Sequence, residues 1–409
     1  MINFMSLDKD IYIKNIKRVY LFSYFWMFLV IMPVVVPYFT SLGLSMEQIF
    51  KLQAIFGFTV AVCEVPSGYL CDLFGRKMTL SIGSFLSALG FTWLVSMDSF
   101  TELVYYEIVI GVAASLVSGT NISILYDSLS HIGDDRGLRT KAMANMQMAH
   151  MGGESTASII GGLLVSISFK AVVIAHAITS WFPFIVSLTL YEPPYKKMDK
   201  NQHVKNMKEI LFHLFKSDKL ILLIFLNLVV WGLSSFIAVW IFQKYWQSEN
   251  IPLAYFGLLW AGYNFFVGIV GKQIHFLEKR FGPTVLLVGL ALLPVAGYFG
   301  MAYFSGWLGI TVGLCFQASR GITNILLRDA FNWRIPSQFR ATANSLTSLA
   351  FRFGFCLVGP FVGYMVDKKG LSISLQYIGL VFAILFVALM IPLILEVRKL
   401  DSNSLGKNC

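Results

Sequence analysis

The sequence predicts an all-α integral membrane protein with twelve transmembrane helices in two pseudo-symmetric six-helix bundles. Three observations support this prediction: the composition, the number and length of the apolar stretches, and the distribution of the basic residues. Of the 409 residues, 56% are hydrophobic and 13% are charged, which is about half the charged fraction of a soluble domain. Because so few charged residues cannot cover a surface in water, the lipid bilayer is the predicted solvent.

Twelve stretches are apolar over roughly the twenty residues that a helix needs to cross the hydrocarbon core. The predicted spans are 19–41, 48–71, 79–97, 103–126, 142–168, 171–190, 219–242, 253–273, 284–303, 306–327, 342–366 and 372–396. We expect each of them to be helical, because a helix pairs all of its backbone polar groups within one segment. No cleavable leader is expected, since the first apolar stretch has the length of a membrane span.

Basic residues accumulate on alternate sides of the predicted spans. Most of the 32 Lys and Arg residues precede the first span, follow the last, or connect an even-numbered span to the next one. The opposite side carries only Lys51, Lys170, Lys244, Lys368 and Lys369. This bias follows the positive-inside rule and predicts that both termini are cytoplasmic. It also accounts for the net charge of +10 without a nucleic acid partner.

The longest polar interruption divides the spans six and six. It begins near Pro193 and Pro194, which cannot continue a helix, and it is rich in lysine. Its apolar residues are spaced three or four apart, which predicts an amphipathic helix on the cytoplasmic membrane face. We therefore expect an N-terminal six-helix bundle over 1–191, a cytoplasmic linker over 192–218, and a C-terminal six-helix bundle with a short tail over 219–409.

An internal repeat indicates that the two bundles are related. The segment 118–129 aligns with 320–331, and 141–145 aligns with 340–344. The matched positions in the first pair of segments are Gly119 with Gly321, Leu125 with Leu327, and Asp127 with Asp329. Parallel halves related by an axis along the membrane normal are one of the known transporter architectures.

A short motif, Gly68-Tyr-Leu-Cys-Asp72-Leu-Phe-Gly75-Arg76-Lys77, connects the second and third predicted spans. We interpret Gly68 as a site of close helix approach, Asp72 as a residue at a helix end, and Gly75 as the turn. The motif resembles the G-x-x-x-D-x-x-G-R-K signature of the major facilitator superfamily, in the same loop and on the same side of the membrane.

This resemblance implies the major facilitator fold and secondary transport, and within that superfamily the chain is similar to the drug/proton antiporters. It implies that the five motif residues Gly68, Asp72, Gly75, Arg76 and Lys77 act in the conformational switch and do not bind the solute.

The chain also departs from the family pattern. Glu107 replaces an arginine that many proton-coupled relatives carry, and we expect it to reach water at the outer end of its helix. The glycines typical of antiporters lie on the eleventh span (Gly354, Gly359, Gly363) and not on the fifth. The second-half counterpart of the loop motif, near 271–282, is stretched.

Ionisable residues inside apolar spans are costly, so each is a candidate functional residue. The proton-coupling candidates are Glu154 and His150, one turn apart on the fifth span, and Glu64 on the second. A permanent ion pair between Glu154 and an arginine is the alternative, and Glu64 has the alternative of a bond within its own helix near Pro66. The candidates for a substrate cavity are Gln147, Asn227, Trp231, Gln317, Arg320, Asn324 and Arg352.

These features predict a secondary active transporter that moves a small amphiphilic or anionic solute by alternating access, with proton-coupled efflux as the expected mode. Uptake of a nutrient or an iron chelate, and a non-transporting membrane sensor, are the alternatives. The sequence contains no Walker loop, zinc-ligand spacing or catalytic motif, so we expect neither an enzyme nor a metal or other cofactor. The expected partners are the solute, protons and lipid, for a monomer in the bacterial inner membrane.

Overall fold

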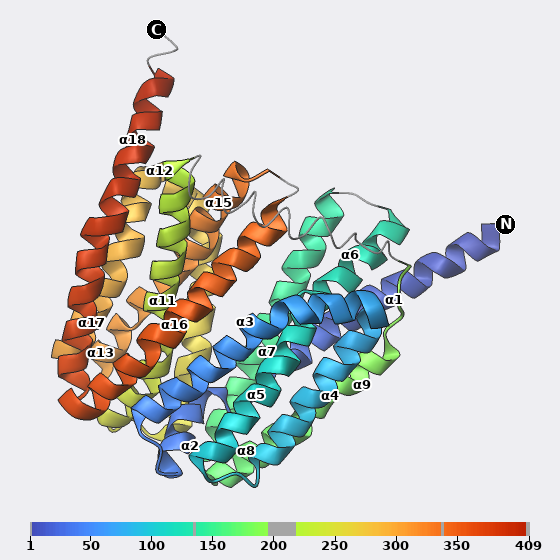
Figure 1. Cartoon of the computed structure of the whole chain (residues 1–409), viewed down its shortest axis with the longest axis horizontal. Coiled ribbons are helices and arrows are strands. Elements are labelled where there is room, and N and C mark those ends of the chain that lie inside the picture. The colour runs from blue at the N-terminus through green and yellow to red at the C-terminus, as the bar shows by residue number, and fades with distance from the viewer. Residues whose placement is uncertain (1, 134–135, 195–217, 337–338, 406–409) are drawn as a thin grey trace. The chain divides into compact units, whose positions relative to one another are not determined.

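The computed structural model describes residues 2–133, 136–194, 218–336 and 339–405, which form helices and short connections without a strand. All twelve predicted spans fall on helices (Figure 1), so the prediction of an all-α membrane protein is confirmed. The amphipathic helix that we expect in the linker lies outside the described residues.

The chain divides into two compact units. Unit 1 comprises Met1–Leu44, Leu52–Met198 and Ile251–Gly262, and unit 2 comprises Ser45–Lys51, Asp199–Asn250 and Tyr263–Cys409. Each unit therefore consists of most of one half of the sequence together with the first residues of one helix from the other half.

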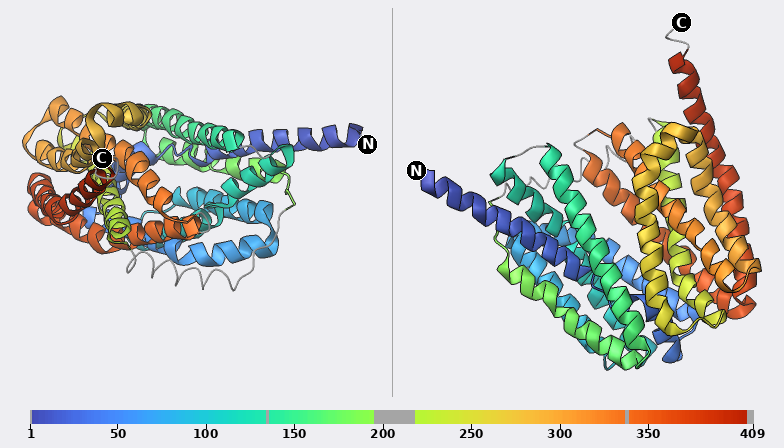
Figure 2. Two further views of the ribbon diagram at one scale, coloured as in Figure 1. Left: turned by 90° about the horizontal axis from the view of Figure 1, so that it is seen from above. Right: turned by 180° about the vertical axis from the view of Figure 1, so that it is seen from behind.

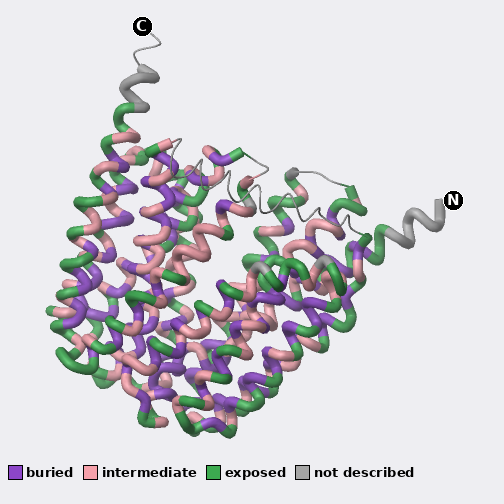
Figure 3. Tube along the Cα trace, viewed as in Figure 1, coloured by how far each residue is buried: buried purple, intermediate pink, exposed green. Residues whose placement is uncertain are grey.

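The helices of unit 1 pack around α1 and α4. They are α1 (Ile2–Trp26), η1 (Met32–Val34), α2 (Val35–Ser41), most of α3 (Met46–Phe74), α4 (Arg76–Leu94), α5 (Phe100–Val117), α6 (Thr120–Ile132), α7 (Arg136–Val165), α8 (Phe169–Thr179) and α9 (Trp181–Thr189). Helix α1 packs against α6, α7 and α9 (Figure 2), and α4 packs against α5, α8 and α9. The buried residues of these helices (Figure 3) include a hydrophobic core around Phe22, Leu80 and Ile124.

The first predicted span is broken in the middle. Helix α1 ends at Trp26, and a short 3-10 turn that contains Pro33 precedes α2. At the break, the backbone N–H of Val30 donates to Nδ1 of His176 at 3.2 Å. This imidazole is 1% exposed, so it supplies the acceptor that a helix carbonyl would otherwise provide to a buried N–H group.

Unit 2 has the same kind of architecture. Its helices are α11 (Lys219–Ser248), most of α12 (Phe256–Tyr303), α13 (Gly306–Val312), α14 (Leu314–Ile322), η4 (Thr323–Leu327), α15 (Arg328–Arg334), α16 (Arg340–Lys369), α17 (Leu371–Leu385), η6 (Phe386–Met390) and α18 (Ile391–Leu405). The segments η4 and η6 are single π-helical turns. The short turn η3 (Leu253–Tyr255) precedes α12 and belongs to unit 1.

A glycine turn occurs at the same place in each half of the chain. Gly75, between α3 and α4, has φ 90° and ψ 161°, and Gly282, within α12, has φ 79° and ψ 160°. Residues with a side chain rarely adopt this conformation. The loop after the eighth predicted span therefore keeps the backbone of the signature motif, although its sequence is stretched.

Eight helical stretches among the described residues are long and apolar enough to cross a membrane, judged by length and composition. One of them, Leu253–Tyr303, has 51 residues and bends at Gly282. At 1.5 Å per residue its length is about 75 Å, enough for two crossings. Helix α7 is not among these stretches, and it carries polar residues such as Gln147, His150 and Glu154.

Candidate functional site

The loop between α3 and α4 takes its shape from one of its two motif glycines. The positive φ of Gly75 confirms its prediction as the turn. Gly68 behaves differently, because no described atom lies within 4 Å of the place that an added Cβ would occupy. The expectation that Gly68 permits close helix approach is therefore wrong. Asp72 lies in the last turn of α3, but its side chain is outside the described part of the structure.

Arg76 fastens the start of α4 to α6. Its guanidinium forms an ion pair with the carboxylate of Asp127 and donates to the carbonyl oxygen of Ser123 at 2.9 Å. Both charged side chains are largely shielded, with 18% and 22% of their area exposed. Asp127 appeared in the sequence only as a repeat position, so sequence reasoning missed it as the partner of Arg76.

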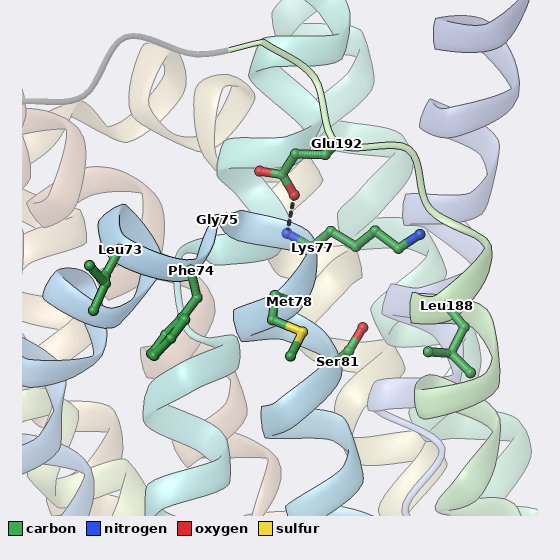
Figure 4. Close-up of a pocket in the computed structure, with 8 residues that line it drawn as sticks. All are labelled: Leu73, Phe74, Gly75, Lys77, Met78, Ser81, Leu188 and Glu192. Atoms are coloured by element: carbon green, nitrogen blue, oxygen red, sulfur yellow. Dashed lines mark hydrogen bonds between the residues drawn. The ribbon is translucent and has the colours of Figure 1, made fainter.

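Glu192 attaches the chain that leaves α9 to the same helix start. Its carboxylate accepts a hydrogen bond from the backbone N–H group of Arg76 at 2.8 Å. It accepts a second one from the backbone N–H group of Lys77 at 2.5 Å, which Figure 4 shows. A carboxylate is favourable here, because the first N–H groups of a helix lack partners within it and carry partial positive charge. Sequence reasoning missed Glu192, although an acidic residue directly before Pro193 was visible.

A pocket of about 480 Å³ lies beside this cap. Its lining residues come from the ends of α3, α4 and α9 and from the chain that follows: Leu73, Phe74, Gly75, Lys77, Met78, Ser81, Leu188 and Glu192 (Figure 4). Most of these side chains are apolar, and Leu73, Phe74 and Met78 are more than half exposed. The pocket is therefore mainly an apolar recess next to a charged helix start.

Glu154 lies on α7, half-buried, and bonds to a tryptophan from the other half of the sequence. Its Oε1 accepts a hydrogen bond from Nε1 of Trp260 at 3.0 Å. Trp260 is 7% exposed and belongs to the first residues of α12, which are part of unit 1. An indole N–H only donates, so Trp260 orients one carboxyl oxygen of Glu154 whether or not the carboxyl is ionised.

His150 lies one turn before Glu154 on the same helix. It is half-buried, and its Nε2 is buried without a hydrogen-bond partner among the described atoms. Gln147, one turn further back, is exposed. These three side chains therefore lie along one stripe of α7, as their spacing predicts.

Glycines bring α7 into close contact with its neighbours. A Cβ added at Gly153 would lie 2.0 Å from the carbonyl oxygen of Tyr24 in α1, and one at Gly161 would lie 2.1 Å from that of Val30. On another side of α7, a Cβ at Gly257 of α12 would lie 2.1 Å from the carbonyl oxygen of Ser158. The close approach of α12 to α7 places Trp260 against Glu154.

The remaining proton-coupling candidate, Glu64, lies on a different helix from Glu154. Glu64 is half-buried in α3, and its backbone carbonyl accepts a hydrogen bond from the Ser67 hydroxyl at 2.8 Å. This bond lies next to Pro66, inside the helix.

In unit 2, Asn227 and Trp231 are fully buried and bond to each other. Nε1 of Trp231 donates to Oδ1 of Asn227 at 2.8 Å, and Nδ2 of Asn227 donates to the carbonyl oxygens of Leu223 and Leu389. Both residues are 0% exposed. The expectation that they line a cavity does not fit this arrangement, in which they pack α11 against the π-helical turn η6.

The polar residues around η4 are arranged differently. Arg320 and Asn324, one turn apart, are exposed, although they lie inside the span Gly306–Arg334. Gln317 is 3% exposed, and its Oε1 has no hydrogen-bond partner among the described atoms. Arg352 is half-buried on α16. No group of three or more His, Cys, Asp or Glu side chains in the described part of the chain is placed to hold a metal ion.

Comparison with known proteins agrees with the fold and the loop motif. The family model described as Major Facilitator Superfamily matches residues 19–359. The chain belongs to the major facilitator superfamily. The prediction of this family from the signature motif is thus confirmed, and the chain is a transporter by family and not an enzyme.

Two relatives from this superfamily align along most of their length. The uncharacterized MFS-type transporter YxaM of Bacillus subtilis is 24% identical over 399 residues, which cover 91% of this chain and 93% of the relative. The uncharacterized MFS-type transporter MJ1560 of Methanocaldococcus jannaschii is 19% identical over 358 residues, covering 84% and 88%.

Solved structures of superfamily members share the fold. A point mutant of the nucleoside transporter NupG superposes with a TM-score of 0.78 at 16% identity, covering 93% of this chain and 98% of that one. A D-xylose–proton symporter gives 0.68 at 15% identity, covering 92% and 96%. A bacterial homologue of the human lysosomal transporter Spinster gives 0.70 at 16% identity, covering 95% and 97%. At these identities the likeness establishes the fold alone.

Proposed function

We propose that the chain is a proton-coupled secondary transporter that exports a small anionic or amphiphilic solute by alternating access. The observation that carries this proposal is the exposed guanidinium of Arg320 inside a membrane span. Arg320 lies about 20 Å along the span from Gly306 at 1.5 Å per residue. A charged side chain at this depth faces water and not lipid, because exposure to hydrocarbon costs several kcal/mol.

The solute class follows from the same face of the helix. Arg320 offers five N–H donors and a permanent positive charge, and the side-chain amide of Asn324 is exposed one turn away. Asn324 lies in the π-helical turn η4, and such turns are frequent at functional sites. A carboxylate, sulfonate or phosphate group on the solute fits this pair of side chains.

Glu154 is the proposed coupling residue. It is half-buried in a membrane helix, and it accepts a hydrogen bond from the neutral indole of Trp260. His150 lies one turn away and is able to exchange a proton with it. Glu64 is a second candidate on α3. Among the solved structures of similar fold, one is named a proton symporter, so the same architecture supports proton coupling elsewhere in the superfamily.

The loop motif is proposed to switch conformations. Gly75 sets the turn between α3 and α4. Arg76 binds Asp127 on α6, and the backbone of Lys77 binds Glu192 after α9, so a movement of α4 relative to α6 or to the chain after α9 would strain these two attachments. Asp72 is proposed to act with them through its position at the end of α3. The protein is further proposed to act as a monomer in the bacterial inner membrane, with both termini cytoplasmic and with a six-helix bundle on each side of the linker 192–218.

The test is transport by the purified protein in vesicles with an imposed pH gradient. The probes are a panel of organic anions and of neutral amphiphilic dyes. We expect solute to move from the cytoplasmic side outward as protons move inward. E154Q is expected to abolish accumulation driven by the gradient but to keep equilibration of the solute, while D98N, which changes an exposed carboxyl, serves as the control.

R320Q tests the solute class. We expect its KM for anionic probes to rise at least tenfold, which corresponds to about 1.4 kcal/mol, with little change for neutral dyes. R328Q removes another exposed arginine two turns further on and is the matched control. If transport by E154Q keeps the pH dependence of the wild type, Glu154 is not the coupling residue. If the solute moves inward together with protons, the proposed export is wrong.

A further inference from the structure

Glu107 is a deeply buried carboxyl that the proposed transport mechanism does not use. It lies on α5 and is 4% exposed, and no other Asp or Glu that the structure describes is buried so completely. Its Oε1 accepts a hydrogen bond from Nε2 of Gln53 on α3 at 3.0 Å. The expectation that Glu107 reaches water along its helix is therefore wrong.

The partner of Glu107 is an amide and not a cation. In the part of the chain that the structure describes, no Lys, Arg or His nitrogen lies within 4.0 Å of its carboxyl oxygens. A charged carboxylate without a counter-ion is costly in a low-dielectric interior, whereas the neutral acid with one hydrogen bond is not. Burial and pairing therefore both favour the protonated form of Glu107 in this conformation.

The other ionisable groups near Glu107 do not change this balance. Tyr106 is its neighbour on α5 and is neutral and buried, and Tyr38 on α2 is likewise buried. On α3, Lys51 pairs with Glu47, while Glu64 lies three turns beyond Gln53. The other charged residues of the neighbouring elements are Asp98 and Glu102 at the start of α5, Arg76 and Lys77 at the far end of α4, and Asp127 and His131 on α6. Asp72 lies at the far end of α3, and its side chain is outside the described part of the structure.

The packing of α3 against α5 keeps water away from this carboxyl. Gly111 lies one turn after Glu107, and an added Cβ there would lie 2.7 Å from Cβ of Thr59 and 3.2 Å from the carbonyl oxygen of Phe56. Both contacts lie on α3, one to two turns after Gln53. The two helices are thus in backbone-level contact next to the Glu107–Gln53 bond, and hydration of the carboxyl requires them to separate.

We propose that Glu107 is a proton-binding site distinct from Glu154, which holds its proton while α3 and α5 are packed and releases it when these helices separate. On release, the carboxyl O–H bond breaks, its electron pair stays on the oxygen, and the proton passes to water. Proton binding and helix packing then bias each other equally, as linked equilibria must. This site does not depend on which solute the protein moves.

Infrared difference spectroscopy on the purified full-length protein in lipid nanodiscs tests the site without a solute. A step from acid to alkaline pH is expected to remove the carbonyl stretch of a protonated carboxyl. We expect this band to be absent in E107Q and to persist in D98N, which alters an exposed carboxyl just before the same helix. A pH indicator should report about one proton fewer released per chain in E107Q than in the wild type.

Two further variants separate proton binding from mere folding. Q53L removes the amide donor, so the band is expected to shift because the carbonyl loses a hydrogen bond. G111A pushes α3 and α5 apart, so the band is expected to disappear at a lower pH than in the wild type. A band that survives in E107Q, or one that Q53L and G111A leave unmoved, overturns the proposal. If the wild type transports a probe but lacks this band, the proton site at Glu107 is refuted and the proposed transport is not. If the band is present but no probe is transported, only the proposed transport is refuted.

Discussion

Asn15 and Tyr191 are joined by two hydrogen bonds between a side chain and a backbone. Oδ1 of Asn15 accepts from the N–H of Tyr191 at 2.8 Å, and Nδ2 donates to its carbonyl oxygen at 3.1 Å. Nδ2 also donates to the hydroxyl of Ser128 on α6 at 2.9 Å. One fully buried side chain therefore connects α1, α6 and the chain that leaves α9, and it places the next residue, Glu192, at the start of α4.

Replacement of Asn15 by Leu tests this connection. The variant removes both hydrogen bonds to the backbone of Tyr191, a residue that is 44% exposed, and such a bond contributes about 0.5–1.5 kcal/mol. We expect a lower melting temperature in detergent and faster hydrogen exchange at the amide of Tyr191. An unchanged exchange rate at this amide would mean that Asn15 does not hold the segment.

Glu192 gives a graded prediction. E192A removes the cap from Arg76 and Lys77 and is expected to cost about 1–2 kcal/mol. E192Q keeps a neutral oxygen acceptor and loses only the interaction of a negative charge with the helix start, about 0.3–1 kcal/mol. Thermal unfolding should therefore rank the stabilities as wild type, then E192Q, then E192A. The reverse order of the two variants would show that the charge of Glu192 destabilises the loop.

The ion pair of Arg76 with Asp127 predicts coupling between two positions in a double-mutant cycle. R76A and D127A are each expected to destabilise the protein, and the double variant should cost less than their sum by about 1–3 kcal/mol, the range for residues in direct contact. D329A is the matched control, because Asp329 is the repeat counterpart of Asp127 but is exposed. Additive effects of R76A and D127A would contradict a direct pairing in solution.

The helices were predictable because each apolar stretch has the length that lipid requires. The break in the first span was not, because the acceptor for Val30 comes from His176, which is 146 residues away in the sequence. Similarly, the separation of α8 from α9 and the π-helical turns η4 and η6 leave the apolar composition of their spans unchanged. Composition specifies that a segment crosses the membrane, but not where its backbone departs from a regular helix.

The candidate site was harder to predict than the fold. The signature motif identified Arg76, but its partners Asp127 and Glu192 lie far along the chain, and one sequence contains no information on such pairs. Asn227 and Trp231 are residue types that often line cavities, but the structure buries both in the core. In a membrane helix the lipid-facing side is as apolar as the packed side, so hydrophobic periodicity does not reveal which side faces the protein interior.

Two glycines on α12 predict opposite effects of the same substitution. In G257A the new methyl group would lie 2.1 Å from the carbonyl oxygen of Ser158, whereas at Gly262 no described atom lies within 4 Å of an added Cβ. Overpacking is expected to cost G257A about 1–3 kcal/mol. G262A is expected to gain about 0.5–1 kcal/mol, because alanine loses less backbone freedom in a helix than glycine does.

The same pair of variants tests how Trp260 reaches Glu154. Displacement of α12 from α7 in G257A should lengthen the hydrogen bond between Nε1 of Trp260 and Oε1 of Glu154. The emission of Trp260 is the difference between the fluorescence of a protein with Trp260 and that of the same protein with W260F. We expect this emission to change in the G257A background and to stay the same in the G262A background. If both alanine variants leave the emission of Trp260 and the melting temperature unchanged, then α7 and α12 are not in backbone contact at Gly257, and the position of Trp260 requires another cause.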